Sequence, residues 1–273
     1  MLPDPQLLIL FALTFIINLV GSLAYSVRIA GVRTMRIAVS FSMYNILVLV
    51  SRTANSFQAP MLAKRVEQHL QTGAGEALAR TGLADFRWLI AAASLATLAG
   101  AVLTPTFQRL FAKGVDGFAA HRSLPRLMFR TFSPVGFMHI RQALALPRAA
   151  NVSALFSQSR ISIGVIAMNM IATAVWTVGV FASIYAGYLN PSLRSTASNL
   201  SGIINGVSTI LLFIVVDPYL SLVTDDVIKG RATEPFFRRS VVWLLASRLG
   251  GTILAQLLLV PAAYAITAAA RWL

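Results

Sequence analysis

The chain contains no cysteine and few charged residues. Charged side chains make up 12% of its 273 positions, against about 25% in a typical soluble domain. Without cysteine the protein has no disulfide, thiolate nucleophile or cysteine metal ligand. Only nine residues are Asp or Glu whereas 23 are Lys or Arg, so the net charge is +14. This composition is outside the soluble globular class, and the excess positive charge predicts contact with anions.

The sequence also lacks motifs for ATP hydrolysis and metal chemistry. None of the three lysines follows a glycine, which excludes a G-x-x-x-x-G-K-[ST] loop. The three histidines lie in predicted loops without the spacing of paired ligands, so we expect no metal and no cofactor. Asp225 and Asp226 are adjacent carboxylates of the kind that hold Mg²⁺, but TDDVIKG lacks the repeated acidic motif of a lipid-phosphate transferase. We interpret this pair as a helix end that interacts with loop arginines, and the chain as a carrier, not an enzyme.

Apolar residues are abundant, at 57% of the chain with a mean hydropathy of +0.73. They form six segments that reach the roughly 20 residues needed to cross a bilayer. The segments cover residues 6–27, 35–60, 86–106, 161–188, 196–223 and 240–263. We therefore predict an all-α integral membrane protein with a single membrane domain over residues 1–273, built as a bundle of six transmembrane helices.

The basic residues predict the orientation of this bundle. The first, third and fifth loops carry 15 Lys and Arg, and the opposite side carries six. The positive-inside rule places these three loops in the cytoplasm and both termini outside. The third loop, residues 110–158, alternates basic and apolar residues around Ser133-Pro134. It is typical of an amphipathic helix pair on an anionic cytoplasmic leaflet, or of a positive-inside loop packed on its own helices.

Polar residues recur at helical spacing within the apolar segments. Residues three, four or seven positions apart share a helix face, and polar faces turn away from lipid. Two interpretations remain open: hydrogen bonds between helices, or a polar cavity. The candidates for lining such a cavity are Asn18, Tyr25, Asn45, Asn55 and Asn205.

Three charged residues lie deep inside apolar segments, away from the segment ends. Counted along their helices, Asp217 and Arg248 both lie roughly 10–12 Å from the cytoplasmic face. They are predicted to form a structural ion pair, or alternatively a gate or coupling pair. Arg52 falls in the outer half, away from Asp217 and with no helical carboxylate at its depth. It is therefore either bonded to carbonyls and Asn side chains or held for an anionic ligand, and a guanidinium suits phosphate.

Proline and glycine mark two further features. Pro218 follows Asp217 and predicts either a simple kink or a break whose freed carbonyls bind a proton or cation. Gly202 and Gly206 form a GxxxG, and residues 179–187 contain a second row of small side chains. Both rows predict close packing of helices within the chain.

Three blocks carry a resemblance to a known family. They read SLAYSVRIAGVRTMRIAVSFSMYNILVLVSRTANSFQAP (residues 22–60), DPYLSLVTDDVIKG (217–230) and SRLGGTILAQ (247–256). Together with chain length and the number of apolar segments, they resemble the Amj family of bacterial lipid II flippases, an alternate to the unrelated MurJ. The resemblance implies transfer of undecaprenyl-pyrophosphate-linked peptidoglycan precursor to the outer leaflet of the bacterial cytoplasmic membrane.

The resemblance implies partners and a binding site. The partners would be lipid II or a related polyprenyl-pyrophosphate glycolipid and anionic membrane lipids, with no nucleic acid. The candidate pyrophosphate-binding residues are Arg28, Arg33, Arg36 and Arg52. Two alternatives are a non-transporting scaffold for cell-envelope enzymes and an intramembrane lipid-pyrophosphate hydrolase. Three helices per half would also permit a 3+3 inverted repeat.

Overall fold

The computed structural model describes residues 4–71, 75–121, 141–145, 147 and 161–273. Within these ranges the chain is helical and contains no strand. Six helical segments are long and apolar enough to cross a membrane, which confirms the predicted six-helix membrane fold. Most of the third loop lies outside the described residues, and so does the predicted break of its amphipathic helices at Ser133-Pro134.

The six spans are longer than their apolar cores. The first four are α1 (Pro5–Thr34), α2 (Ile37–Gln71), α3 (Gly75–His121) and α7 (Ile163–Leu189). The fifth is composite: a 3₁₀ turn, η1 (Pro191–Leu193), precedes α8 (Arg194–Leu211), a π-helical turn η2 (Leu212–Val216) and α9 (Asp217–Ile228). The sixth is α10 (Glu234–Trp272). Helix α2 continues past Pro60, where its span was expected to end.

Local sequence signals explain where several of these helices begin and end. The Asp4 side chain caps α1 by accepting a hydrogen bond from the Gln6 backbone N–H at 3.0 Å, and Pro5 occupies the first turn. Met35 ends α1 in the left-handed conformation, with φ of 56°. Thr233 caps α10 in the same way as Asp4 caps α1, by accepting from the backbone N–H of Phe236.

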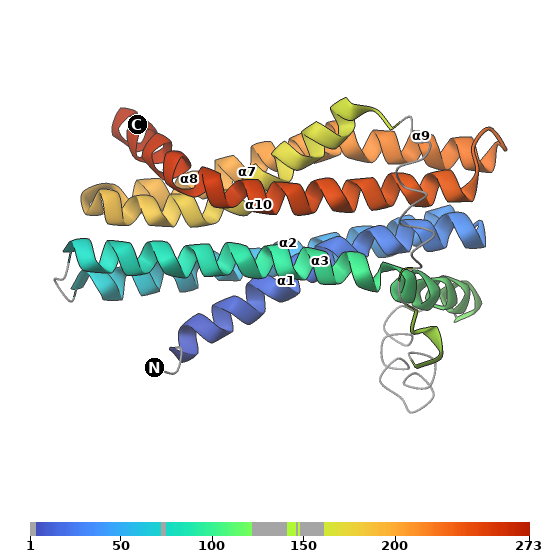
Figure 1. The fold of residues 1–273 in the computed structure, drawn as a ribbon, viewed down its shortest axis with the longest axis horizontal. Coiled ribbons are helices and arrows are strands. Elements are labelled where there is room, and N and C mark those ends of the chain that lie inside the picture. Colours follow the sequence, from blue (N-terminus) through green and yellow to red (C-terminus); the bar gives the residue numbers. More distant parts are fainter. Residues whose placement is uncertain (1–3, 72–74, 122–140, 146, 148–160) are drawn as a thin grey trace.

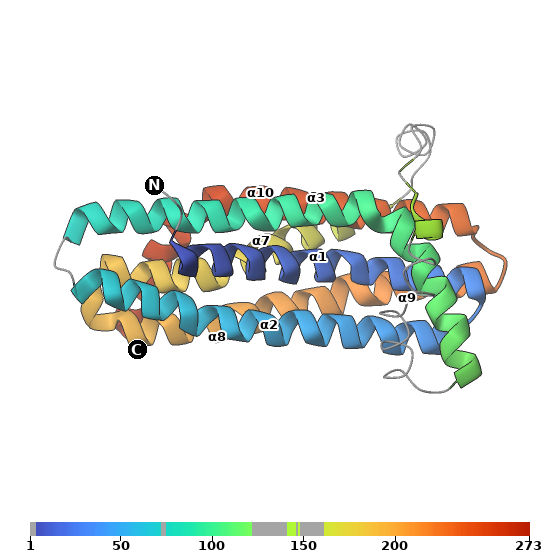
Figure 2. The ribbon, with the colours of Figure 1, turned by 90° about the horizontal axis from the view of Figure 1, so that it is seen from below.

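The helices form two layers (Figure 1). Helices α1, α2 and α3 make one layer, and α7, α8, α9 and α10 make the other. Within the layers α1 packs on α2 and α3, and α7 packs on α8 and α10. Both termini lie at the same end of the bundle, as an even number of spans requires, and the view turned by 90° shows the helices running side by side along its length (Figure 2). The protein therefore consists of an N-terminal and a C-terminal half with an interface between them.

Small residues set how closely these helices approach. A Cβ on Gly251 of α10 would lie 2.5 Å from the Met170 carbonyl oxygen of α7. A Cβ on Gly179 of α7 would lie 2.8 Å from Ile204 of α8, so the row in α7 packs closely as predicted. Gly202 and Gly206 have nothing within 4 Å of such a Cβ. The prediction that this GxxxG packs against another helix of the chain is wrong, because that face of α8 points away from the bundle.

Two apolar clusters occupy the two ends of the interface. The cluster near the chain termini includes buried Leu10, Leu62, Phe86, Phe181 and Leu259. The cluster at the opposite end includes buried Ile29, Val32, Leu220, Phe237 and Val241. Arg52 and Arg248 lie along the bundle between these two clusters.

Candidate functional site

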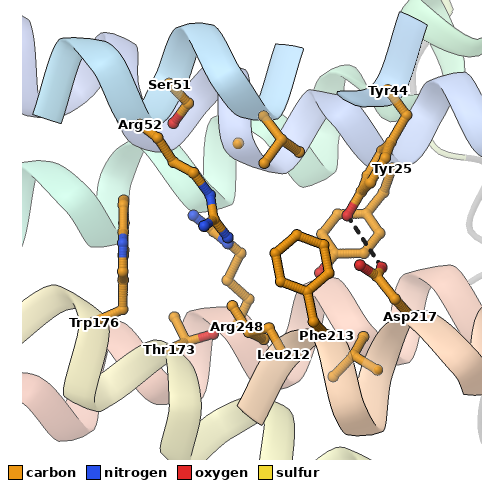
Figure 3. A pocket seen from close by; sticks show the side chains of 13 residues that line it. Tyr25, Tyr44, Ser51, Arg52, Thr173, Trp176, Leu212, Phe213, Asp217 and Arg248 are labelled. Carbon is orange, nitrogen blue, oxygen red and sulfur yellow. Dashed lines mark hydrogen bonds between the residues drawn. The ribbon is translucent and has the colours of Figure 1, made fainter. Parts of the chain in front are cut away.

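A small polar cavity lies between the two halves of the protein (Figure 3). Its volume is about 60 Å³, enough for a few water molecules. Every span except α3 contributes to its wall. The lining residues are Gly21, Tyr25, Tyr44, Val48, Ser51, Arg52, Thr173, Trp176, Leu212, Phe213, Val216, Asp217 and Arg248.

Two arginines from opposite halves point into this cavity. Arg52 of α2 donates a hydrogen bond to the Thr209 hydroxyl at 3.1 Å, and its guanidinium lies 5.2 Å from the Phe213 ring centroid. Arg248 of α10 is 8% exposed and its guanidinium lies 5.6 Å from the Trp176 ring centroid. Among the described residues, no carboxylate lies within ion-pair distance of either guanidinium. A guanidinium without a counter-ion at this depth is costly, and an anionic ligand would offset that cost.

The carboxylate that lines the cavity, Asp217, is half-buried and is bonded to a different arginine. Arg28 of α1 donates from Nη2 to the Asp217 Oδ1 at 2.8 Å, and the Tyr44 hydroxyl donates to the same oxygen at 3.4 Å. The predicted ion pair between Asp217 and Arg248 is therefore wrong. Depth along the helices did not predict whether Arg28 or Arg248 would bond to Asp217. The rotation of α1 about its axis points Arg28 toward this carboxylate.

Arg52 lies in the same cavity as Asp217 and Arg248, so the prediction that it lies apart from them is wrong. Arg52 comes 15 residues after the start of α2 and Arg248 comes 14 residues after the start of α10. At 1.5 Å per residue these distances are about 22 Å and about 21 Å from the same end of the bundle. The error arose from counting to the expected end of the span at Pro60, whereas α2 continues to Gln71.

Several buried donors around the cavity lack a hydrogen-bond partner. They are Nε and Nη1 of Arg28, Nε of Arg248 and Oγ1 of Thr173. Buried polar groups are normally paired, so these donors, beside two guanidinium groups without a carboxylate partner among the described residues, favour a ligand rich in acceptor atoms. With Arg28, Arg52 and Arg248 against a single Asp217, the four charged side chains sum to +2. The arrangement is complementary to a group with several anionic oxygens.

The π-helical turn places Asp217. The backbone N–H of Asp217 donates to the Leu212 carbonyl five residues earlier, and Pro218 has no N–H to offer the Ile214 carbonyl. The span is therefore not broken at this point, and the predicted kink stays a prediction. It contains one wide turn, a feature that is frequent at functional sites.

The other predicted site residues lie outside this cavity. Arg33 and Arg36 are exposed near the end of α1, where Arg36 forms an ion pair with Asp116 at 3.2 Å. Asn45 is exposed on α2, and its predicted position in the cavity wall is wrong because it lies on the outward side of that helix. Asn18 bonds to the Thr14 carbonyl within α1, and Asn55 and Asn205 are half-buried away from the lining. Of the proposed cavity-lining residues, only Tyr25 lies in the wall of this cavity.

Tyr44, Trp176 and Thr173 line the cavity but were not among the predicted site residues. Tyr44 lies eight residues before Arg52, about two helical turns away on the same side of α2. That spacing is a usable signal, but an isolated tyrosine near a membrane interface is common. Tyr44 belongs to α2, whereas Thr173 and Trp176 belong to α7, so only the approach of these two helices brings the three side chains to one cavity.

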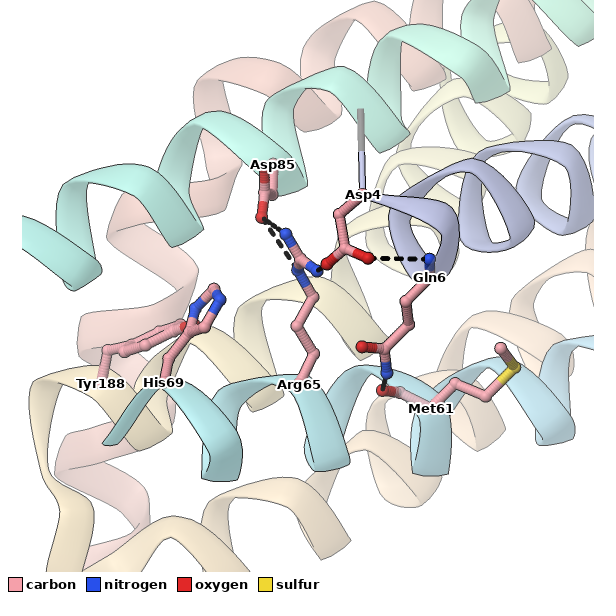
Figure 4. Close-up of polar contacts among 7 residues, drawn as sticks. All are labelled: Asp4, Gln6, Met61, Arg65, His69, Asp85 and Tyr188. Carbon is pink, nitrogen blue, oxygen red and sulfur yellow. Dashed lines mark hydrogen bonds and ion pairs between the residues drawn. The ribbon is translucent and has the colours of Figure 1, made fainter. Parts of the chain in front are cut away.

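A second polar cluster lies at the end of the bundle that carries the termini (Figure 4). Arg65 of α2 bonds to Asp85 of α3 at 2.8 Å and also to Asp4 at the beginning of α1. His69 Nδ1 lies 2.7 Å from the Tyr188 hydroxyl, which connects α2 to α7. This cluster joins four helices, and all its arginine charge is compensated by carboxylates, in contrast to the central cavity.

The fold and the cavity define a class of protein: a six-span membrane protein with a cationic cavity between two helical halves. Binding sites at such an interface, near the middle of the membrane, are typical of carriers. The chain belongs to the Amj family, described as alternate to MurJ, whose model matches residues 13–270. It is 36% identical over 269 residues to the lipid II flippase Amj of Bacillus subtilis (strain 168), covering 98% of this chain and 97% of that one. No solved structure matches the chain.

Proposed function

We propose that this protein is a lipid II flippase, which moves the polyprenyl-pyrophosphate-linked precursor of peptidoglycan from the cytoplasmic to the outer leaflet. The observation that carries the proposal is the pair Arg52 and Arg248, which face one cavity from opposite halves without a carboxylate partner among the described residues. Membership of the Amj family and the named relative from Bacillus subtilis support the same substrate.

In this proposal the two arginines bind the pyrophosphate of the substrate. A guanidinium binds phosphate oxygens through paired N–H donors, and such charge-assisted bonds are stronger than neutral ones. Because Arg52 belongs to the N-terminal half and Arg248 to the C-terminal half, a bound pyrophosphate would hold the halves together around it. Arg28 adds a third cation at the edge of the same cavity.

The cavity must widen during transport. A volume of about 60 Å³ accommodates neither a disaccharide nor a pentapeptide. Rocking of one half against the other is the usual way in which a carrier exposes its site to each side in turn. The polyprenyl chain would remain in the bilayer if the opening between the halves extends sideways to lipid.

The proposal also includes an orientation. The end of the bundle with exposed Arg33 and Arg36 would face the cytoplasm of a bacterium, and both termini would lie outside. Positive charge at that end favours anionic phospholipid headgroups and the pyrophosphate of the substrate in the inner leaflet. Substrate would enter from this side and leave toward the end that carries the cluster around Arg65.

The direct test is transport of fluorescent lipid II by the purified full chain in liposomes. Arg52→Gln and Arg248→Gln should each lower the initial rate by about 10- to 100-fold, because each removes a charge-assisted bond of about 1.5–3 kcal/mol. Arg271→Gln is the matched control, since it removes an exposed arginine from the same helix as Arg248. We expect it to transport at the wild-type rate.

Three results would overturn parts of the proposal. Wild-type protein that leaves lipid II in its original leaflet would favour a scaffold, and release of phosphate from lipid II would favour a hydrolase. Full transport by both arginine variants would remove Arg52 and Arg248 from the binding site.

A further inference from the structure

The ion pair between Arg28 and Asp217 stands between two cavities. Asp217 lines the central cavity, whereas Arg28 lines a second cavity of about 180 Å³ nearer the end of α1. The second cavity is lined by Arg28, Ile37, Ser40, Phe41, Ser221, Thr224 and Asp225. The ion pair therefore borders both cavities, one through each partner.

Arg28 is held in place with most of its donors unused. It is 4% exposed, and its guanidinium lies 4.2 Å from the Tyr44 ring centroid and 4.6 Å from that of Phe41. Only Nη2 donates to a carboxylate, while Nε and Nη1 are buried without a partner. Because a guanidinium presents five donors, Arg28 is preorganised for a ligand with more oxygen atoms than Asp217 supplies.

The carboxylate of Asp217 makes only weak contacts with Arg28 and Tyr44. It contacts Arg28 through a single oxygen instead of the two-oxygen arrangement that is strongest for arginine and carboxylate. Its second contact, from Tyr44, is long at 3.4 Å. Its side chain is 18% exposed and follows the π-helical turn, so part of the carboxylate already faces the central cavity. A pyrophosphate carries more charge and more acceptor oxygens than this carboxylate.

We propose that Asp217 is a placeholder for the substrate, which occupies Arg28 until the pyrophosphate displaces it. Binding of pyrophosphate then breaks the ion pair and opens the path between the two cavities. The displaced carboxylate stays at the wall of a cavity that contains Arg52 and Arg248, so it remains among cations. This inference rests on the proposed function, because it assigns a competitor to the site through which the substrate would pass.

The test measures binding of undecaprenyl pyrophosphate to the full chain in nanodiscs, with undecaprenol as the uncharged probe. Asp217→Asn should raise the affinity for undecaprenyl pyrophosphate by about tenfold and leave undecaprenol binding unchanged. Asp226→Asn removes a carboxylate from the same helix, paired with Arg231 at 2.8 Å and lining neither cavity. It should leave both affinities at the wild-type value.

A double-mutant cycle separates displacement from a general gain of positive potential. If Asp217 acts by occupying Arg28, then Asp217→Asn gives no gain when Arg28→Gln is already present. Should Asp217→Asn fail to fold, Tyr44→Phe provides the second variant, because it removes one contact of the carboxylate without changing charge. It should raise the affinity by about twofold.

The inference fails if Asp217→Asn gives no gain, if the gain equals that of Asp226→Asn, or if it persists with Arg28→Gln. Transport of fluorescent lipid II by the wild-type protein is measured in parallel. Absence of that transport overturns the proposed function itself, whereas transport without the gain in affinity overturns only the role of Asp217.

Discussion

At the scale of single residues, the central cavity depends on one glycine as much as on its arginines. A Cβ on Gly21 of α1 would lie 2.9 Å from Nη2 of Arg248, closer than side chains normally approach. The guanidinium therefore reaches across the interface between the halves because α1 has no side chain at this position. A glycine inside a helix is less stable than an alanine by up to about 1 kcal/mol. Its presence here indicates that the position has to be free of a side chain.

Gly21→Ala should lower transport of lipid II by about tenfold while leaving the thermal stability unchanged or slightly higher. The added methyl displaces the flexible end of Arg248 from the cavity, and alanine favours the helix. Gly202→Ala is the matched control, because a Cβ there meets nothing within 4 Å. Equal transport by the wild type and Gly21→Ala would show that the position of the Arg248 guanidinium is unimportant.

At the scale of elements, the fifth span is the one in which the described residues contain a π-helical turn. The π-helical turn η2 lengthens the path by one residue relative to an α-helix and thereby sets the rotation of α9. Pro218 supports that turn, because it lacks the N–H that an α-helical hydrogen bond to the Ile214 carbonyl would need.

Pro218→Ala should reduce transport at least fivefold and raise the thermal midpoint of unfolding. The restored N–H allows an α-helical bond to Ile214, which tightens the turn and rotates Asp217 away from Arg28. Pro261→Ala, in the exposed outer part of α10, is the control and should leave transport unchanged. If the two proline variants transport equally well, the wide turn does not position Asp217 for function.

The cluster around Arg65 is the second feature at this scale, and it joins the ends of α1, α2 and α3. The hydrogen bond from Arg65 lowers the pKa of the exposed Asp4 carboxyl below the usual value of 3.8. The contact between Arg65 and Asp4 therefore persists at neutral pH and is lost as the pH falls through the lowered pKa of Asp4. Asp85 is the more buried partner, with its side chain 14% exposed.

Arg65→Ala should destabilise the protein by about 1–3 kcal/mol, since it leaves the largely buried Asp85 carboxylate without its counter-ion. The measurement is thermal unfolding in detergent at neutral pH. Adding Asp85→Asn to this variant should restore part of the lost stability. A loss of stability unaffected by the second substitution would mean that the arginine acts by packing alone.

At the scale of the whole molecule, the proposed transport requires the two halves to move apart, because the central cavity is too small for the head of the substrate. Val66 of α2 and Gly187 of α7 meet across the interface at the end that carries the termini, where a Cβ on Gly187 would lie 3.8 Å from Cγ1 of Val66. Because these two positions are neighbours across the interface, a pair of cysteines introduced there can test whether the halves separate. The native chain has no cysteine, so no other thiol competes.

The variant with Val66→Cys and Gly187→Cys should lose lipid II transport on oxidation and recover it on reduction, because the disulfide prevents the halves from separating at the exit. Each single variant should transport equally well under both conditions. Full transport by the oxidised double variant would show that substrate leaves without separation of the halves at this end.

The sequence by itself determined the class of the protein and the number of its spans. Six segments of sufficient length and hydrophobicity can cross a bilayer, whichever helices they pack against. The blocks at residues 22–60, 217–230 and 247–256 were enough to identify the family. Scarcity of acidic residues also made an uncompensated arginine predictable, and Arg52 has no carboxylate partner among the described residues.

Only the tertiary structure decided which charges meet. Position along a chain gives depth in the membrane only when the helix ends are known, and α2 extends 11 residues past its expected end at Pro60. The direction of a side chain depends on how each helix is rotated, and close contacts such as those at Gly21, Gly179 and Gly251 set that rotation. For this reason Asp217 bonds to Arg28, while Arg248 joins Arg52 in the central cavity.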